Sequence, residues 1–231
     1  MAKEKKQKEE DDKKIELKWV HYLYEFFIVV LGISVPFLLS KCNENSVLRK
    51  TELIYLENIK QDLVQDSMAL YGNQLFNQRL IDNSHLMSQI IITQDHLLAD
   101  SLAKKALLLT EFSDFHKGSS VYETLSKSGE LDVLTNIELV TSLGRLDELY
   151  TYINRLEDNN NQIIFSVFPE LSKNIQLKPL KAKNIEALYQ HEFHNMVLVF
   201  GDIYVEKDSL YGEALQHIGS LINFLDDEVS K

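Results

Sequence analysis

An apolar segment near the N-terminus, Val20 to Leu39, limits the folds open to this chain; its sequence is VHYLYEFFIVVLGISVPFLL. From Phe26 to Leu39 it carries no charge, and eleven of these fourteen residues are Phe, Ile, Val or Leu. Such a run favours a bilayer over water by about 3–7 kcal/mol. A buried core helix would have to hide all fourteen residues without a polar face. Because a hydrocarbon core needs about 20 residues, we predict a transmembrane helix over residues 19–41.

Aromatic and basic residues flank this segment. Trp19, Tyr22 and Tyr24 lie at its start, where amphipathic rings prefer the boundary between membrane and water. Lys18 and Lys41 bracket the segment and can extend their ammonium groups toward water. The flanks therefore favour a membrane span and predict the lipid bilayer as a partner.

Glu25 is the candidate functional residue of this segment. An ionisable group within or beside a span is costly to bury in lipid, so its presence indicates a role. Pairing with another membrane subunit is one interpretation. A position at the level of the cytoplasmic headgroups is the other.

The distribution of basic residues predicts how the segment crosses the membrane. Residues 1–18 hold seven lysines, whereas only Lys41, Arg49 and Lys50 follow the segment closely. The flank richer in lysine and arginine stays in the cytoplasm. We therefore expect an inner-membrane protein with a charged cytoplasmic tail (1–18), a transmembrane helix (19–41) and a periplasmic domain (42–231).

A cleaved signal peptide is the main alternative, since it also combines a basic start with a short apolar core. The charged region is long for a signal peptide, and no small-x-small cleavage site follows it. The LSKC sequence that ends at Cys42 partly matches a lipoprotein box, although a lysine directly before the cysteine fits that pattern badly. Cleavage of the segment and lipidation of Cys42 both stay open.

Two motifs carry a resemblance to a known family. The first is EFFIVVLGISV, which begins at Glu25 and is followed by Asn43-Glu44; the second is YETLSKSGEL, which begins at Tyr122 and is followed by Asn136 and Leu139. The chain resembles a family of single-pass membrane proteins of unassigned function from Bacteroidetes-type bacteria. It departs from that family at residues 36–38, where Pro-Phe-Leu replaces the usual Ala-Leu-Gln, and it lacks a Trp before Asn-Glu. The resemblance implies a short cytoplasmic tail, one transmembrane helix and a helical domain outside the cytoplasm.

The rest of the chain has the pattern of long helices. Only three prolines and eight glycines occur in 231 residues, and apolar residues recur at intervals of three and four. We predict an all-α fold: the transmembrane helix followed by an antiparallel bundle of four to five helices. The predicted helices and connections run over 48–92 (one helix or two joined near Gly72), 100–112, 121–127 (closed by Gly129), 137 to the Asn run 159–161 with Asn136 as N-cap, a connection over 169–179, and a final helix from Asn184.

Charge and cysteine content exclude several kinds of function. The net charge is −11, and residues 1–18 contribute +1, so the remaining residues carry −12. An acidic body repels phosphate backbones, so we expect no nucleic-acid partner. With Cys42 as the only cysteine, an intrachain disulfide and a cysteine-based zinc cluster are both impossible.

Two groups of residues could tempt a catalytic interpretation. His191 and His194 share a helix face at a spacing of three, which differs from the His-Glu-x-x-His motif of zinc proteases. A second group, around His116, consists of Asp114, His116, Ser119 and Ser120. We interpret the first pair as solvated surface histidines and the second group as loop residues. The sequence thus predicts no catalytic residue, no metal ligand and no cofactor.

These observations favour a membrane-anchored helical interaction module that binds itself or another protein of the cell envelope, and not an enzyme. The first alternative is a ligand-sensing domain that signals through a membrane partner, because an 18-residue tail is too short for an output domain. The second alternative is a metal-dependent envelope enzyme that uses His191 and His194.

Overall fold

The computed structural model describes the backbone of residues 2–118 and 120–230, and the side chains of 26–32, 34, 41, 45–118 and 120–230. The chain divides into two compact units, Met1–Glu52 (unit 1) and Leu53–Lys231 (unit 2). Over the described residues the elements are α1 (Ala2–Ile92), η1 (His96–Leu98), α2 (Ala99–Leu108), α3 (Val121–Ser128), η2 (Leu131–Val133), α4 (Ile137–Asn174), β1 (Ile175–Leu177), β2 (Leu180–Ala182), α5 (Ile185–Leu188) and α6 (His191–Val229). Helices dominate these residues, so the predicted all-α class is confirmed.

Unit 1 consists of the first part of α1. The six residues from Phe26 to Leu31 are all exposed, with between 38% and 66% of each residue accessible to solvent. Nowhere in the part of the chain whose side chains are described does a helix hold a stretch long and apolar enough to span a bilayer. The side chains of Glu25 and Cys42 lie outside the described residues, and so do most side chains of residues 19–41. The transmembrane helix over 19–41 therefore stays a prediction.

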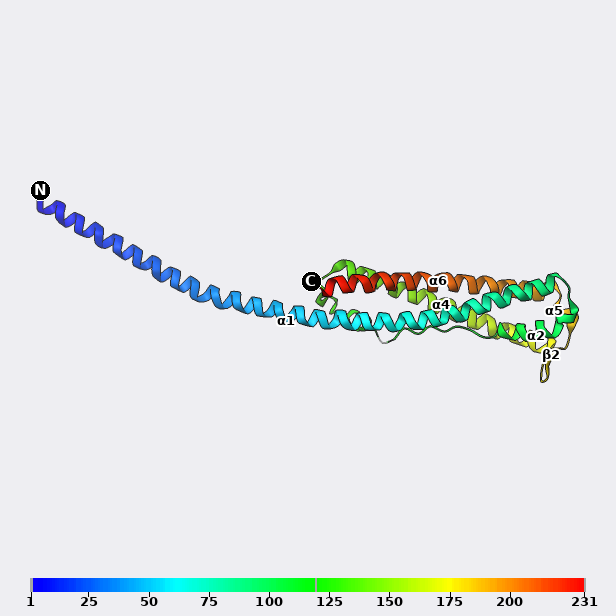
Figure 1. Ribbon diagram of the computed structural model, residues 1–231. Helices are drawn as coiled ribbons and strands as arrows, with labels where there is room; N and C mark the ends of the chain where they lie inside the picture. Colours follow the sequence, from blue (N-terminus) through cyan, green and yellow to red (C-terminus); the bar gives the residue numbers. More distant parts are fainter. Residues whose placement is uncertain (1, 119, 231) are drawn as a thin grey trace. The chain divides into compact units, whose positions relative to one another are not determined.

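Unit 2 contains three long helices, namely α1 from Leu53 onward, α4 and α6 (Figure 1). Ser88 near the end of α1 bonds His194 near the start of α6 at 2.8 Å, and Lys60 pairs with Asp226 at the opposite ends. Helix α6 therefore runs antiparallel to α1. The same holds for α4 and α6, because Ser142 bonds His217 (2.9 Å) at one level and Tyr152 bonds Glu206 (2.9 Å) further along.

Buried apolar stripes hold the long helices together. The predicted stripes on α1 and α4 are confirmed: Leu56, Ile59 and Leu63, and likewise Leu143 and Leu146, are buried. Residues spaced three and four apart share one helix face, so each helix can bury a continuous row. These rows meet matching rows of α6, including Phe200, Ile218 and Leu221, in two core clusters along unit 2.

The two predicted helix boundaries around α3 are confirmed. Gly129 closes α3 with φ = 76°, a left-handed conformation that costs little only for glycine. Asn136 caps α4, since its side chain accepts hydrogen bonds from the backbone N–H groups of Glu138 (3.0 Å) and Leu139 (3.3 Å). Gly129 therefore ends α3 and Asn136 begins α4, each for the expected physical reason.

The predicted end of the next helix in the Asn run 159–161 is wrong. Helix α4 continues to Asn174, because Ile164 and Leu171 prolong its buried stripe beyond the asparagines. Pro169 lies inside the helix at an exposed position, so solvent can reach the backbone around it. Burial of the stripe thus outweighs the weak local signals of asparagine and proline.

The predicted connection over 169–179 is therefore partly helix and partly a small antiparallel β-hairpin. Strands β1 and β2 pair Ile175 with Ala182 and Leu177 with Leu180. Three residues per strand are too few to show an alternating pattern. The final helix predicted from Asn184 is in fact two: Asn184 caps the single turn α5, and α6 begins only at His191.

Candidate functional site

The most unusual part of unit 2 is the return connection from α2 to α3. Residues 112–118, here called the strap, have no regular secondary structure (Figure 1). The strap lies along the long helices with alternating burial: Ser113 and Phe115 are buried, whereas Phe112, Asp114, His116 and Gly118 are exposed. The ring of Phe115 packs against that of Tyr150 at a tilt of 54°, with centroids 5.0 Å apart. Where a segment without helix or sheet is buried, its backbone polar groups must find partners among side chains.

Two buried carboxylates hold N–H groups of the strap. Glu157 of α4 accepts the N–H of Phe115 with both oxygens, at 3.2 and 3.1 Å. Asp66 of α1 accepts the N–H of Gly118 at 3.1 Å. Each carboxylate lies on the buried face of its helix and bonds the backbone of the strap.

Further side chains donate hydrogen bonds to carbonyl groups of the strap, and one accepts a hydrogen bond from the backbone at the start of α3. Lys207 Nζ and Asn73 Nδ2 approach the carbonyl oxygens of Ser113 and Asp114, each at 3.5 Å. Asp62 accepts the N–H of Val121 at 2.9 Å. All three long helices thus contribute side chains that hold this connection, α1 through Asn73 and Asp62.

Glu157, Lys207, Tyr211 and Ser113 form a buried polar cluster beneath the strap. Tyr211 donates its hydroxyl hydrogen to Glu157, and its oxygen lies 2.8 Å from Ser113 Oγ. Burial raises the pKa of Glu157, while the hydrogen bonds from Tyr211 and Phe115 and the charge of Lys207 act in the opposite direction. The cluster is held together by charge-assisted hydrogen bonds in a low-dielectric environment.

Lys207 is the cation among these four residues, and its pKa is strongly lowered. Only 1% of the residue is exposed. Burial lowers its pKa to about 8, against the opposing attraction of Glu157 and Asp114. A perturbed lysine can mark a catalytic site, but no member of the cluster exceeds 2% exposure, so a substrate cannot reach it. The arrangement positions the strap and gives no indication of chemistry.

A second polar group surrounds Asp66 and Tyr150. They line a cavity of about 20 Å³ together with Lys117 and Asp147. Burial raises the pKa of Asp66 and also raises the pKa of Tyr150. A cavity of this size holds one water molecule and excludes a larger ligand.

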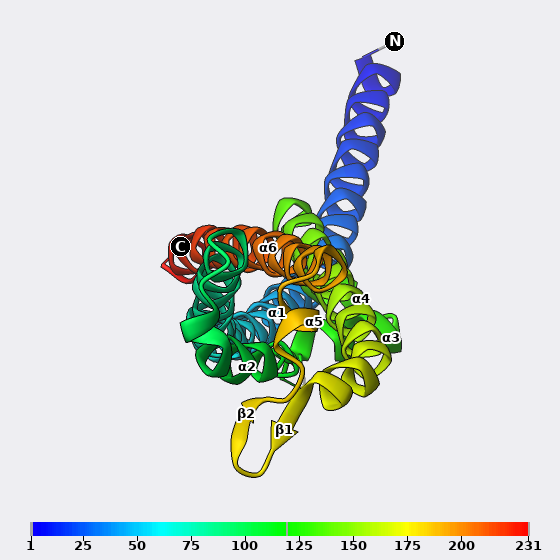
Figure 2. The ribbon, with the colours of Figure 1, turned by 90° about the vertical axis from the view of Figure 1, so that its right-hand side faces the viewer.

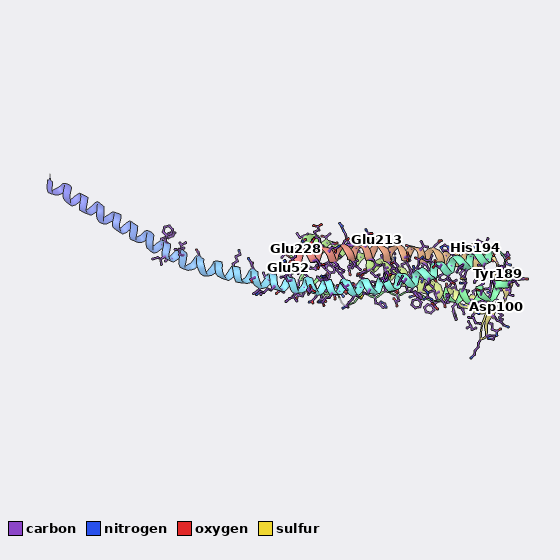
Figure 3. All side chains as sticks on the ribbon, viewed as in Figure 1. Glu52, Asp100, Tyr189, His194, Glu213 and Glu228 are labelled. Carbon is purple, nitrogen blue, oxygen red and sulfur yellow. The ribbon has the colours of Figure 1, made fainter. Side chains whose placement is uncertain are left out.

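The structure does not assemble the predicted histidine and serine groups into a site. His194 bonds Ser88, and His191 is exposed one turn earlier; Figure 3 shows His194 and Tyr189 toward the end of unit 2 that carries α5. Among the side chains that the structure describes, no group of three or more histidines, cysteines, aspartates or glutamates could hold a metal ion. His116 lies 3.1 Å from Asp114 on the surface, and Ser119 is outside the described residues.

Sequence reasoning missed Glu157 and Lys207. A signal for both was present: Glu157 follows Ile153 at the spacing of four that defines the stripe of α4, and Lys207 lies between Tyr204 and Tyr211 in the stripe of α6. A charged residue at a stripe position predicts a buried polar partner. The sequence does not indicate that the partner is the strap backbone.

Comparison of the chain with protein-family models, with curated proteins and with solved structures finds no match.

Proposed function

We propose that this chain is a membrane-anchored module of the cell envelope, with residues 19–41 as the span, a cytoplasmic N-terminus and a periplasmic helical domain that binds another protein or a second copy. The observation that carries the proposal is the exposed run from Phe26 to Leu31. Six consecutive apolar side chains on one helix favour a lipid environment over water. The excess of lysines in residues 1–18 supports the orientation.

Membrane fractionation tests the anchor. We expect the full chain to sediment with membranes, to resist a carbonate wash and to be released by detergent. The double variant Ile28→Lys/Leu31→Lys should move to the supernatant, since each lysine at a helix centre costs about 3 kcal/mol of insertion free energy. The control Ile54→Lys/Met68→Lys adds the same charge at exposed positions of α1 in unit 2 and should stay with the membrane. Wild-type protein in the supernatant after a hard spin without detergent refutes the anchor.

Reporter fusions at the C-terminus test the orientation. A reporter active only in the periplasm should give signal, and one active only in the cytoplasm should not. The reverse result overturns the assignment of the cytoplasmic side to residues 1–18.

Binding of a protein partner is supported by large apolar side chains on the surface of unit 2. Phe165 on α4 is 75% exposed, and Phe168 is exposed one turn later. Photocrosslinking in membranes from position 165 should trap a partner or a second copy, whereas position 127, an exposed lysine, serves as control. Recovery of monomer alone from both positions argues against an interaction module.

The second candidate, ligand sensing through a membrane partner, is favoured by one groove. It has a volume of about 270 Å³ and lies between α1 and α2, lined by Arg79, Asn83, Lys105 and Glu111 among others. A ligand bound at a hundred times its Kd would stabilise the chain by about 2.7 kcal/mol. The lining holds two basic residues, Arg79 and Lys105, and two acidic ones, Asp82 and Glu111. A thermal-shift screen of zwitterionic metabolites checks this, with Arg79→Gln as the variant that should lose the shift.

A further inference from the structure

The β-hairpin at the end of unit 2 contacts α2 and α4 through its strands, and its turn extends beyond the helices. Strands β1 and β2 are joined by the two-residue turn Lys178-Pro179, and the hairpin projects from the helical body (Figure 2). Ile175, Leu180 and Ala182 join the core at the base of the hairpin, whereas the turn adds nothing to it. Its surface chemistry is therefore informative about what it contacts.

The base of the hairpin is firmly held. Ile175 is buried, and the N–H of Ala182 donates to Asp100 of α2 at 2.8 Å. The N–H groups of Lys183 and Asn184 both donate to the carbonyl oxygen of Asn174, at 2.9 and 3.1 Å. These bonds fix where the turn is presented, so its ligand would meet a preformed surface.

The tip of the hairpin combines an exposed apolar side chain with unpaired lysines. Leu177 lies next to the turn and is 54% exposed. Lys178, Lys181 and Lys183 are exposed, and no carboxylate among the described residues forms an ion pair with any of them. Because paired residues share a face and successive residues alternate, Leu177 lies on the face opposite Lys181. Apolar surface and positive charge therefore meet around the turn at Lys178 and Pro179.

This charge stands against that of the rest of unit 2. Residues 173–183 hold four lysines and no acidic residue, whereas the remainder of 53–231 holds 10 basic and 26 acidic residues. Charges further apart than about 8 Å are largely screened at physiological ionic strength. Because the hairpin projects, an anionic surface can meet the lysines while the acidic body stays screened.

Protection of a strand edge is the simpler explanation of such lysines, since charged side chains block edge-to-edge pairing. It accounts for Lys181, which lies within β2. It does not account for Lys178 in the turn or for the exposed Leu177. Both positions call for a partner that is apolar and anionic at once.

We propose that the hairpin is a contact site for an anionic lipid surface, with Leu177 and Pro179 entering the headgroup region and Lys178, Lys181 and Lys183 lying against lipid phosphates. The tip is convex, whereas peptide recognition uses a groove or a free strand edge. The cations are lysines, which act as point charges and lack the planar fork of arginine. A planar phosphate surface therefore fits better than an acidic peptide. The inference deepens the proposed function and rests on it for the presence of a bilayer.

Vesicle flotation tests the proposal with the full chain held in nanodiscs of neutral phosphatidylcholine. Wild-type nanodiscs should float with added vesicles that contain phosphatidylglycerol and should not float with vesicles of phosphatidylcholine alone. Each lysine at an anionic surface gives about a fivefold gain in binding, so K178Q/K181Q/K183Q should bind about 100-fold more weakly. L177N should also bind more weakly, although its charge is unchanged.

The control K127Q/R145Q/R155Q removes three exposed positive charges from α3 and α4 and should bind as the wild type does. Unchanged circular dichroism of each variant shows that the fold is retained. The proposal is overturned if the hairpin variant binds anionic vesicles normally, if the control loses binding equally, or if labelled polyglutamate binds the hairpin while anionic vesicles do not. If the chain lacks an anchor, which refutes the proposed function, the free chain is mixed with the same vesicles and the same variants decide the outcome.

Discussion

Lys207 provides the sharpest quantitative test of the buried cluster. Its pKa is lowered to about 8 from the ordinary 10.5 because the residue is buried. Between these two values the unfolded chain keeps a proton that the folded chain has released. The free energy of unfolding therefore rises as the pH increases from about 8 to 10.5. This gain is lost again as the pH falls through the pKa of the folded chain.

The size of this effect follows from the shift. A difference of about 2.5 pKa units corresponds to about 3 kcal/mol, of which about 2 kcal/mol develops between pH 7 and 9.5. The window closes there because tyrosines begin to titrate near pH 10 in the unfolded chain. The buried Tyr204 and Tyr211, whose pKa values are raised by burial, then lower stability at higher pH.

The perturbation is Lys207→Met, which keeps the length of the side chain and removes the proton. Urea unfolding of the full chain in neutral detergent, followed by circular dichroism, gives the free energy of unfolding at each pH. Wild type should gain about 2 kcal/mol from pH 7 to 9.5, and the variant should lose this gain. Stability at pH 7 alone is no guide, because the variant leaves Glu157 buried without its cation, which is destabilising in itself.

Lys104→Met is the matched control, since Lys104 is exposed on α2. It should keep the wild-type rise. A flat wild-type profile, or a rise that persists in Lys207→Met, would refute the assignment of the buried proton to this lysine.

Three further predictions concern the strap and the caps. Phe115→Ala should cost about 3–5 kcal/mol in urea unfolding, because a fully buried ring leaves a cavity; a cost below 1 kcal/mol would show that the strap is loosely held. Asp66→Asn should reduce the loss of stability that wild type shows as pH rises above about 4, since burial raises the pKa of Asp66 and its ionised form is disfavoured in the fold; the part due to Glu157, whose pKa is also raised, should remain, and thermal melts from pH 4 to 7 check this. Gly129→Ala should lower the melting temperature by the equivalent of about 1 kcal/mol because its φ is positive, whereas Gly219→Ala, inside α6 with nothing near its Cβ position, should raise it.

The helices were predictable from sequence where burial follows one stripe. The rows around Ile59 and Leu143, the Gly129 cap and the Asn136 cap all rest on local geometry that a short stretch of sequence specifies. The continuation of α4 through Pro169 was not predictable. It depends on Leu171 finding a buried position that only the folded unit supplies.

The candidate site was less predictable than the fold. Glu157 and Lys207 stand out on their helices, but the groups they bind lie far along the chain, at Phe115 and Ser113. An apolar stripe predicts which face of a helix is buried, but it does not predict which segment packs on that face. The lysines of 173–183 lie in or just after the predicted connection over 169–179, and their proposed role emerged from the projection of the hairpin turn (Figure 2).

The strap explains why charged groups are buried in a helical unit that could have been wholly apolar. Replacing a buried ion pair by apolar residues is often neutral or stabilising. Here, replacing Glu157 and Lys207 by apolar residues would leave the N–H of Phe115 and the carbonyl of Ser113 without partners, because the strap has no helix or sheet to satisfy them. An extended connection that lies along a helical core therefore requires polar side chains at particular stripe positions. The positions of Asp66 and Glu157 thus fix the path of the strap, and a change of register by one residue would break both bonds at once.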